Sequence, residues 1–273
     1  MWLCVRSLLF THNRNKKGGN DMRHYEFLGN VNMKICGGKA KGLFYLNSIG
    51  MNIPETLVIP NNISLKDYEK EIKAFVNKIV LTYGNVKFAV RSSAINEDGI
   101  NCSWAGMYDT FLNVQADNVF DTIKSAIQYK QTERNNCYKN LIEDGGNTEK
   151  ISVVLQRMIV PKVSGVCFTL NPVNKDSDET IIEVVEGLGE KLVSGQVTPQ
   201  MYILDKQGTC LGYDPGECEK VLLTDDFLKK FRLEVSKIQK HIYEAADIEF
   251  AVDGEEIYFL QVRPITALYK KVG

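Results

Sequence analysis

Apolar residues recur at the three- and four-residue spacing of an amphipathic helix in three stretches of the chain. Residues 65–83 place such side chains on one face, and Ser64 stands where a helix N-cap is expected. The same spacing returns in residues 119–139 and in residues 225–246. The sequence therefore predicts three helices, each with an apolar face that must be buried against another element.

Short runs rich in β-branched and aromatic residues lie before, between and after these stretches, and such runs are typical of strands. We expect strands at residues 56–59, 88–90, 152–155, 165–169, 180–185, 248–252 and 256–262. Asp253 and Gly254 separate the last two runs, and an Asp-Gly pair between alternating strands favours a hairpin. Residues 140–150 are expected to form a surface loop. The pattern predicts an α+β protein with mainly antiparallel strands.

The composition is that of an ordinary globular protein. The 273 residues are 44% hydrophobic and 25% charged, enough for one large domain or two small ones. The 33 basic and 34 acidic residues leave a net charge of -1, so no large uniform field attracts nucleic acid or an anionic membrane. No apolar run is long enough to predict a transmembrane helix.

The cysteines and the first residues of the chain bear on the cellular compartment of the protein. Seven cysteines, an odd number without a CxxC pair, argue against a disulfide framework and a zinc site, and reduced thiols in a cytoplasmic protein are the simpler interpretation. Residues 1–10 are briefly apolar but lack the basic start and the cleavage site of a secretory signal. We expect residues 1–21 to be a disordered or non-native extension, with Met22 as an alternative start.

A glycine- and lysine-rich segment, residues 37–42, precedes an apolar run that is expected to be helical. Glycines let the backbone approach an anion, amide groups at a helix start can bind phosphate, and Lys39 adds a positive charge. The segment lacks the spacing of a Walker A loop. Taken alone, such a segment is more often a plain loop than a phosphate site.

Arg91 ends a predicted buried strand and is followed by Ser92 and Ser93. A guanidinium with neighbouring hydroxyls suits a polyphosphate. The polar, glycine-bearing residues that follow, 96–110, are candidates for a mobile flap over a nucleotide. The alternative, an arginine paired with a nearby carboxylate, is about equally favoured by the residues alone.

Two further motifs are weak by themselves. Gln156 and Met158 end a predicted strand that could present backbone groups and an apolar side chain to a purine, although a methionine there is more often a core residue. Gly187 and Gly189 mark a tight backbone after another strand, a pattern that fits any loop.

The predicted hairpin carries the most specific motif. Alternation places Asp247 and Glu249 on one face of the first strand, and Gln261 and Arg263 on one face of the second. Antiparallel pairing can bring these faces together, and burying them is costly unless something binds there. Carboxylate and carbonyl oxygens suit Mg²⁺, and an arginine can neutralise charge on a phosphoryl group in transfer. The alternative is a salt-bridged polar face in solvent.

Six segments in order, among them SWAGMYDTFLNV, SGVCFTLNP and EGLGEKLVSGQVTP, give the chain a family resemblance. From Gly37 to Thr266 the chain resembles the N-terminal ATP-binding domain of phosphoenolpyruvate synthase, pyruvate phosphate dikinase and rifampicin phosphotransferase. The resemblance implies an ATP-grasp fold, in which two α+β subdomains clamp ATP. We assign residues 22–158 to the first subdomain, with phosphate loop and flap, and residues 159–273 to the second, with the metal and catalytic arginine.

The resemblance also implies roles for single residues near the nucleotide. Lys39 and Arg91 match the phosphate-binding pair, which also serves catalysis. Gly106 and Thr110 stand where the family's flap meets the phosphates. Gln156 matches the residue at the adenine side of the hinge.

At the hairpin, the resemblance agrees with the interpretation of the residues themselves. Glu249 and Gln261 match the Mg²⁺ ligands of the family, and Asp247 lies beside them as a third metal candidate. Arg263 matches the catalytic arginine.

Departures from the family narrow the expected function. Ala40 replaces a usual glycine, the stretch from Lys39 to Arg91 is shorter, and the pyruvate-binding barrel has no counterpart. None of the three histidines lies in the context of the family's phosphocarrier: His12, His24 and His241. We expect ATP- and Mg²⁺-dependent phosphoryl transfer to a histidine on a separate, substrate-binding partner. The alternatives are a stand-alone small-molecule kinase and a non-catalytic nucleotide-binding regulatory module, against which the complete set of metal and phosphate residues argues.

Overall fold

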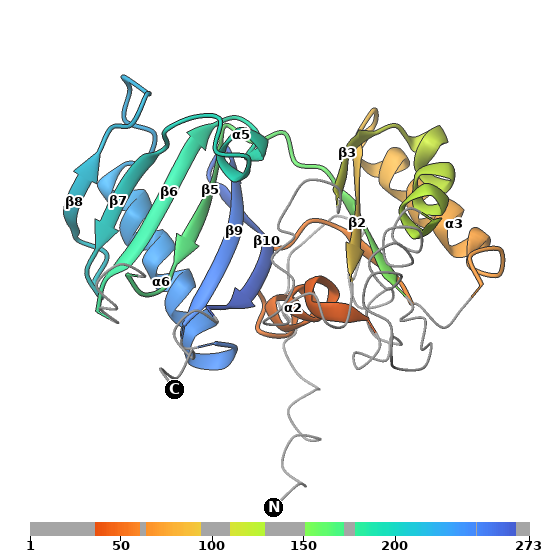
Figure 1. Ribbon diagram of the computed structural model, residues 1–273, viewed down its shortest axis with the longest axis horizontal. Coiled ribbons are helices and arrows are strands. Elements are labelled where there is room, and N and C mark those ends of the chain that lie inside the picture. The colour runs from red at the N-terminus through yellow and green to blue at the C-terminus, as the bar shows by residue number, and fades with distance from the viewer. Residues whose placement is uncertain are drawn as a thin grey trace, which may run out of the picture.

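Two antiparallel sheets stand side by side in the computed structural model (Figure 1). The structure describes residues 36–60, 64–93, 110–128, 151–171, 178–243 and 245–265. The first sheet has the order β1-β4-β2-β3, with strands β1 (Thr56–Ile59), β2 (Phe88–Ser93), β3 (Thr110–Val114) and β4 (Ser152–Arg157). The second has the order β10-β9-β5-β6-β7-β8, with strands β5 (Val163–Phe168), β6 (Thr180–Glu186), β7 (Gln200–Leu204), β8 (Cys210–Asp214), β9 (Ala246–Asp253) and β10 (Glu256–Pro264).

Helices cover one face of each sheet, and one helix lies between the sheets (Figure 1). The described helical elements are α2 (Gly37–Ser48), α3 (Glu69–Tyr83), the short 3₁₀ helix η1 (Ala116–Asn118), α5 (Glu190–Val193) and α6 (Asp225–His241). Residues 119–128 are also helical. Within the described ranges, no helix is long and apolar enough to cross a membrane.

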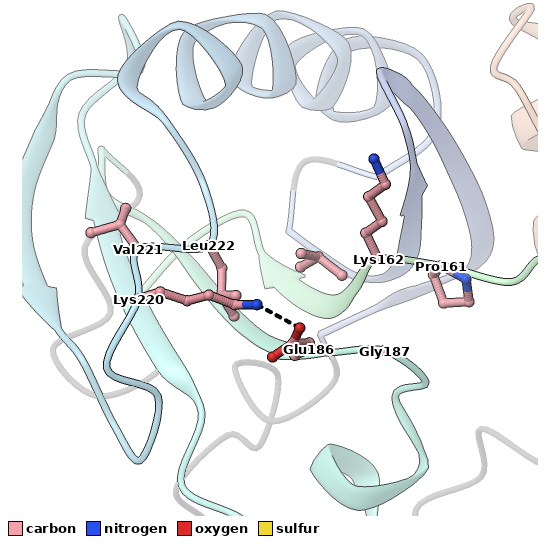
Figure 2. A pocket seen from close by; sticks show the side chains of 8 residues that line it. Pro161, Lys162, Glu186, Gly187, Lys220, Val221 and Leu222 are labelled. Atoms are coloured by element: carbon pink, nitrogen blue, oxygen red, sulfur yellow. Dashed lines mark hydrogen bonds and ion pairs between the residues drawn. The ribbon is translucent and has the colours of Figure 1, made fainter.

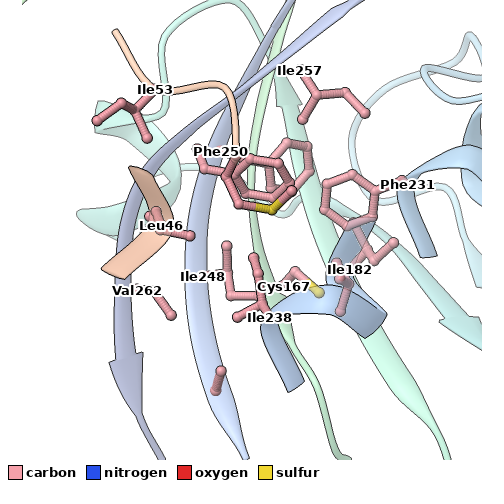
Figure 3. Packing of buried hydrophobic residues seen from close by; sticks show 14 of the residues in the cluster. Leu46, Ile53, Cys167, Ile182, Phe231, Ile238, Ile248, Phe250, Ile257 and Val262 are labelled. Atoms are coloured by element: carbon pink, nitrogen blue, oxygen red, sulfur yellow. The ribbon is translucent and has the colours of Figure 1, made fainter. Parts of the chain in front are cut away.

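Two apolar cores form where alternation turns faces of the strands toward helices. In the first core, Phe75 of α3 packs against Phe88 of β2, and both are almost fully buried. In the second, Phe231 of α6 lies beside Phe250 of β9, with ring centroids 4.5 Å apart (Figure 3). The opposite face of the first sheet is partly apolar as well, since Val58 and Val154 belong to the second core together with α2.

The predicted strands are all present, and every strand pair is antiparallel. The predicted hairpin is confirmed, because β9 and β10 pair on either side of a turn in which Gly254 has a φ of 61°. Three strands were not predicted: β3, β7 and β8. Both β3 and β8 are sheet edges whose residues, apart from Val114, are half-buried or exposed, so they lack a strong apolar pattern.

Two helix boundaries differ from the prediction. α3 begins at Glu69, and its N-cap is Tyr68, so the expected capping role of Ser64 is wrong. The backbone carbonyl of Ser64 instead accepts hydrogen bonds in a turn that precedes the helix. α6 ends at His241 rather than at residue 246, because residue 246 is already the first residue of β9. Residues 129–139, the predicted loop 140–150 and most of the predicted flap lie outside the described residues.

Helix α2 replaces the loop that was expected at residues 37–42. The helix begins at Gly37, which has a φ of 77°. A Cβ atom at this position would collide with Ser93 of β2, so the close approach of the two segments requires a glycine. The Ser93 hydroxyl donates to the Cys36 carbonyl at 2.7 Å, and the Ala40 amide donates to the same hydroxyl oxygen at 3.2 Å. Ser93 thus fixes the first turn of α2 against the first sheet, and Ala40 in this turn is fully buried.

The middle of α2 packs on the second sheet through Gly42. A Cβ atom at this position would collide with the backbone carbonyl oxygen of Val262 in β10. A glycine is therefore needed for close packing, although it lowers the helix propensity by about 1 kcal/mol relative to alanine. α2 connects both sheets with little room for adjustment.

We predict that Gly42→Ala lowers the free energy of unfolding by about 1–3 kcal/mol, the usual cost of overpacking, despite the better helix propensity of alanine. Urea unfolding followed by circular dichroism measures this change. Lys41→Ala, at an exposed position of the same helix, is the control and should change stability by less than about 0.5 kcal/mol. A stabilised Gly42→Ala variant would contradict the close packing.

Candidate active site

The register of the β9–β10 hairpin brings its four predicted site residues together in two rows. Gln261 lies opposite Glu249, and Arg263 lies opposite Asp247, so each pair projects from the same face of the sheet. This is the juxtaposition that alternation and antiparallel pairing predict.

A β-bulge makes this arrangement possible. The register of β10 shifts between Phe259 and Gln261, and the extra residue is Leu260. Before the bulge, Ile257 and Phe259 face the core. After it, Val262 faces the core and Gln261 turns to the polar face. The bulge thus changes the phase of the alternation inside one strand.

Arg91 reaches this face from the first sheet. Its Nη2 atom donates to Glu249 Oε2 and to Gln261 Oε1, each at 2.9 Å. Its Nη1 atom donates to the carbonyl oxygen of Leu260 at 3.1 Å. Arg91 is 9% exposed, so these bonds are shielded from water. The arginine is paired with a carboxylate, as in the alternative interpretation, but the carboxylate belongs to the other sheet.

Arg263 and Asp247 form an ion pair in the next row. Arg263 Nε donates to Asp247 Oδ2 at 2.7 Å, and Nη2 lies 2.6 Å from the same oxygen. The carboxylate side chain is 11% exposed and the arginine side chain 50%. Burial raises the pKa of Asp247 despite the opposing effect of Arg263, and the negative charge of Glu249 raises it further. The arginine remains accessible to an anion in solvent.

The other predicted site residues that the structure describes lie on three different elements of the fold. Thr110 begins β3 directly opposite Arg91. Lys39 is half-buried in the first turn of α2. Gln156 is buried in β4, where its Nε2 donates to Thr56 Oγ1 at 3.0 Å. Gly106 lies outside the described residues. Direct contacts therefore unite Arg91 with Glu249 and Gln261, while Gln156 is bonded elsewhere in the first sheet.

A second polar cluster, which the motifs did not reveal, lies beside Gln156. Arg157 Nε and the Tyr83 hydroxyl both donate to the carboxylate of Glu55. The Arg157 guanidinium lies 4.2 Å from the ring centroid of Tyr83 and 5.8 Å from that of Tyr258 on β10. Because Tyr258 belongs to the second sheet, the cluster links the two sheets near the segment that connects β4 to β5.

The environment of this cluster shifts its pKa values. Burial alone would raise the pKa of Glu55, but the hydrogen bond from Tyr83 and the ion pair with Arg157 together lower it. Burial and the bond to Glu55 raise the pKa of Tyr83 to about 12. The cluster is therefore charged and hydrogen-bonded at neutral pH. In the sequence, only the charge of Arg157 next to the predicted hinge residue hints at it.

A cavity of about 420 Å³ lies elsewhere, at the start of β5 and the end of β6 (Figure 2). Its lining includes Lys162, Val221 and the exposed ion pair between Lys220 and Glu186, whose atoms are 2.6 Å apart. None of the predicted site residues lines this cavity. It contains Gly187 of the weak glycine motif, which thus stays separate from the hairpin face.

The donor atoms at the hairpin fit a magnesium ion. Glu249 and Gln261 each direct an oxygen to one positively charged nitrogen, so these two oxygens already converge on a cation. Among the described residues, no group of three or more acidic, histidine or cysteine side chains could hold a metal by itself. Mg²⁺ commonly takes one or two carboxylates and completes its shell with water and substrate phosphates, and this small donor set matches that habit.

The fold and this face together define an α+β protein of the ATP-grasp class. The chain belongs to the family of the pyruvate phosphate dikinase AMP/ATP-binding domain, whose model matches residues 61–219 and 211–273.

Named relatives are much longer than this chain. A probable phosphoenolpyruvate synthase of Methanocaldococcus jannaschii is 34% identical over 211 residues, which make up 68% of this chain and 18% of that protein. The phosphoenolpyruvate synthase of Pyrococcus furiosus is 34% identical over 235 residues, 73% of this chain and 28% of that protein. The chain thus spans less than a third of either relative.

Among solved structures, PH1788 from Pyrococcus horikoshii superposes with a TM-score of 0.50 at 12% identity, over 88% of this chain and 98% of that one. At this identity the likeness bears on the fold alone.

We predict that Glu55→Gln destabilises the protein by about 3 kcal/mol or more, because it leaves Arg157 buried without its counter-charge. The lowered pKa of Glu55 means that its contribution is present above its ordinary pKa of 4.5 and is lost as the pH falls through the lowered value. The difference between wild type and variant should therefore shrink in acid. Urea unfolding between about pH 6 and pH 3 measures it.

Glu234→Gln is the matched control, since Glu234 forms an i,i+3 ion pair with Lys237 on the surface of α6. This variant should stay within about 0.5 kcal/mol of wild type. A pH-independent difference between Glu55→Gln and wild type would contradict the charged state of the cluster.

Proposed function

We propose that this chain binds ATP with Mg²⁺ and carries out phosphoryl transfer of the phosphoenolpyruvate synthase and pyruvate phosphate dikinase type. One observation carries the proposal. Arg91 of the first sheet meets Glu249 and Gln261 of the second, beside the ion pair of Arg263 and Asp247. Two guanidinium groups and three oxygen-bearing side chains on one face suit a polyphosphate together with a divalent cation.

In this proposal each group has a separate task. Lys39 and Arg91 bind the phosphates, and the flap with Gly106 and Thr110 closes over them. Gln156 lies at the adenine side. The two sheets serve as the two subdomains, which we expect to meet at residues 158 and 159.

The hairpin residues act on the phosphates. Glu249 and Gln261 would hold Mg²⁺, with Asp247 next to them, and the metal supplies positive charge to the phosphate oxygens when bound. Arg263, whose side chain is half-exposed, turns toward the phosphoryl group and stabilises the charge that develops in transfer. Arg263 would thus give up part of its bond to Asp247 during the reaction.

The acceptor is proposed to be a histidine of a separate polypeptide. The net reaction consumes ATP, water and the histidine, and it yields a phosphohistidine bearing the β-phosphorus, AMP and inorganic phosphate. The similarity to phosphoenolpyruvate synthases supports phosphoryl transfer from ATP. The match covers 18% and 28% of those relatives, and we propose that the acceptor histidine corresponds to a part of them outside the match.

Incubation with Mg²⁺ and ATP, with and without a histidine-bearing partner, tests the proposal by separating AMP from ADP. We expect AMP and phosphate only when the partner is present. Formation of ADP with a small acceptor would favour a stand-alone kinase instead. Nucleotide binding without turnover under every condition would favour a regulatory module, and no binding of ATP would contradict the proposal altogether.

We predict that Arg263→Ala keeps the Kd for ATP within about tenfold of wild type, or about 1.4 kcal/mol. The rate of ATP consumption should fall at least about a hundredfold, or about 2.7 kcal/mol, because the side chain acts on charge that develops only during transfer. Arg263→Lys keeps the counter-charge of Asp247 and separates a local folding defect from a catalytic one. Equal losses of affinity and rate would assign Arg263 to binding.

A further inference from the structure

Arg91 occupies the position that a bound cation would need. A single nitrogen, Nη2, lies 2.9 Å from both Glu249 Oε2 and Gln261 Oε1. Nη1 is bonded to the carbonyl of Leu260, which the β-bulge frees from the regular ladder. The oxygens proposed to hold the metal are therefore already bonded to a positive group that belongs to the protein.

This position does not satisfy the arginine completely. Its Nε atom is buried and has no hydrogen-bond partner, which is uncommon for a buried polar atom. A guanidinium in its final position would be expected to use all of its donors. A polyphosphate offers more acceptor oxygens and more negative charge than one carboxylate and one amide, so it can draw the side chain away.

We propose that Arg91 and the divalent cation compete for the oxygens of Glu249 and Gln261, so that the metal enters the site only together with the nucleotide. The inference rests on the proposed function. Without phosphates, the guanidinium holds both oxygens and repels a second cation. With phosphates, Arg91 exchanges the carboxylate for a phosphate oxygen and leaves the two oxygens to the metal.

Linkage makes this exchange measurable. If the nucleotide raises the affinity for the metal by moving Arg91, the metal must raise the affinity for the nucleotide by the same factor. Removing the guanidinium should then strengthen metal binding in the absence of nucleotide and abolish most of this coupling. A purely structural arginine would show neither effect.

The experiment measures binding of Mn²⁺ to the full chain by the electron paramagnetic resonance signal of the free ion, with and without a non-hydrolysable ATP analogue. For wild type we expect weak binding of Mn²⁺ alone and a gain of at least about tenfold with the analogue. For Arg91→Gln we expect binding of Mn²⁺ alone to be at least about tenfold tighter than in wild type, with the gain from the analogue reduced to less than about threefold.

Arg263→Gln is the matched control. It removes the same charge from the neighbouring row of the same face, and its partner is Asp247, the third metal candidate, rather than either of the two oxygens that Arg91 holds. Its effect on binding of Mn²⁺ alone should stay below about threefold. An equal gain in both variants would mean that loss of either positive charge strengthens metal binding, without a special role for the contacts of Arg91, and it would overturn the inference.

The remaining outcomes also decide the question. Unchanged binding of Mn²⁺ to Arg91→Gln, with its fold verified by circular dichroism, overturns the inference while the proposed function stands. If that variant fails to fold, Arg91→Lys replaces it, and a gain of less than about threefold in binding of Mn²⁺ alone counts against the inference. If wild type binds neither the analogue nor Mn²⁺ in its presence, the proposed function fails as well.

Discussion

The guanidinium of Arg91 joins two sheets that are also connected by an apolar core. Val58 and Val154 of the first sheet belong to the same buried cluster as α2 and the second sheet, whereas the other cluster lies against the first sheet alone. The contacts from Arg91 to Glu249, Gln261 and the Leu260 carbonyl set the relation between them at the polar face. The candidate site is thus made by the junction of the sheets rather than by either sheet alone.

Two further contacts support this junction on different sides. Gly42 lets α2 approach β10 while Ser93 ties the same helix to β2. Arg157, held by Glu55, reaches the ring of Tyr258 near the connection from β4 to β5. The polar and aromatic contacts of Arg157 can be exchanged for others more easily than the apolar packing of α2. The packing of α2 on β10 leaves little room for adjustment between the sheets.

The sequence predicted the hairpin and the residues that share a face of each strand, because these predictions need local rules only. The register that places Gln261 opposite Glu249 depends on the bulge at Leu260, which no motif predicted. The partner of Arg91 is 158 residues away, and no local rule predicts such a contact. The resemblance placed Arg91 near phosphate, whereas the structure pairs it with a carboxylate. The start of α2 was missed because glycines usually lower helix propensity, while here close packing requires them.

The β-bulge at Leu260 gives β10 two successive patterns. Its first half reads as a core strand through Ile257 and Phe259, and its second half presents Gln261 and Arg263 on the other face. The buried apolar residues of β10 have odd numbers before the bulge, at Ile257 and Phe259, and an even number after it, at Val262. Losing Leu260 would leave a regular ladder with the same partners, because Gln261 would then follow Phe259 directly and still lie opposite Glu249. Keeping Leu260 in a regular ladder without the bulge would exchange the inside and the outside of everything that follows, turning Arg263 toward the core and Val262 toward the polar face.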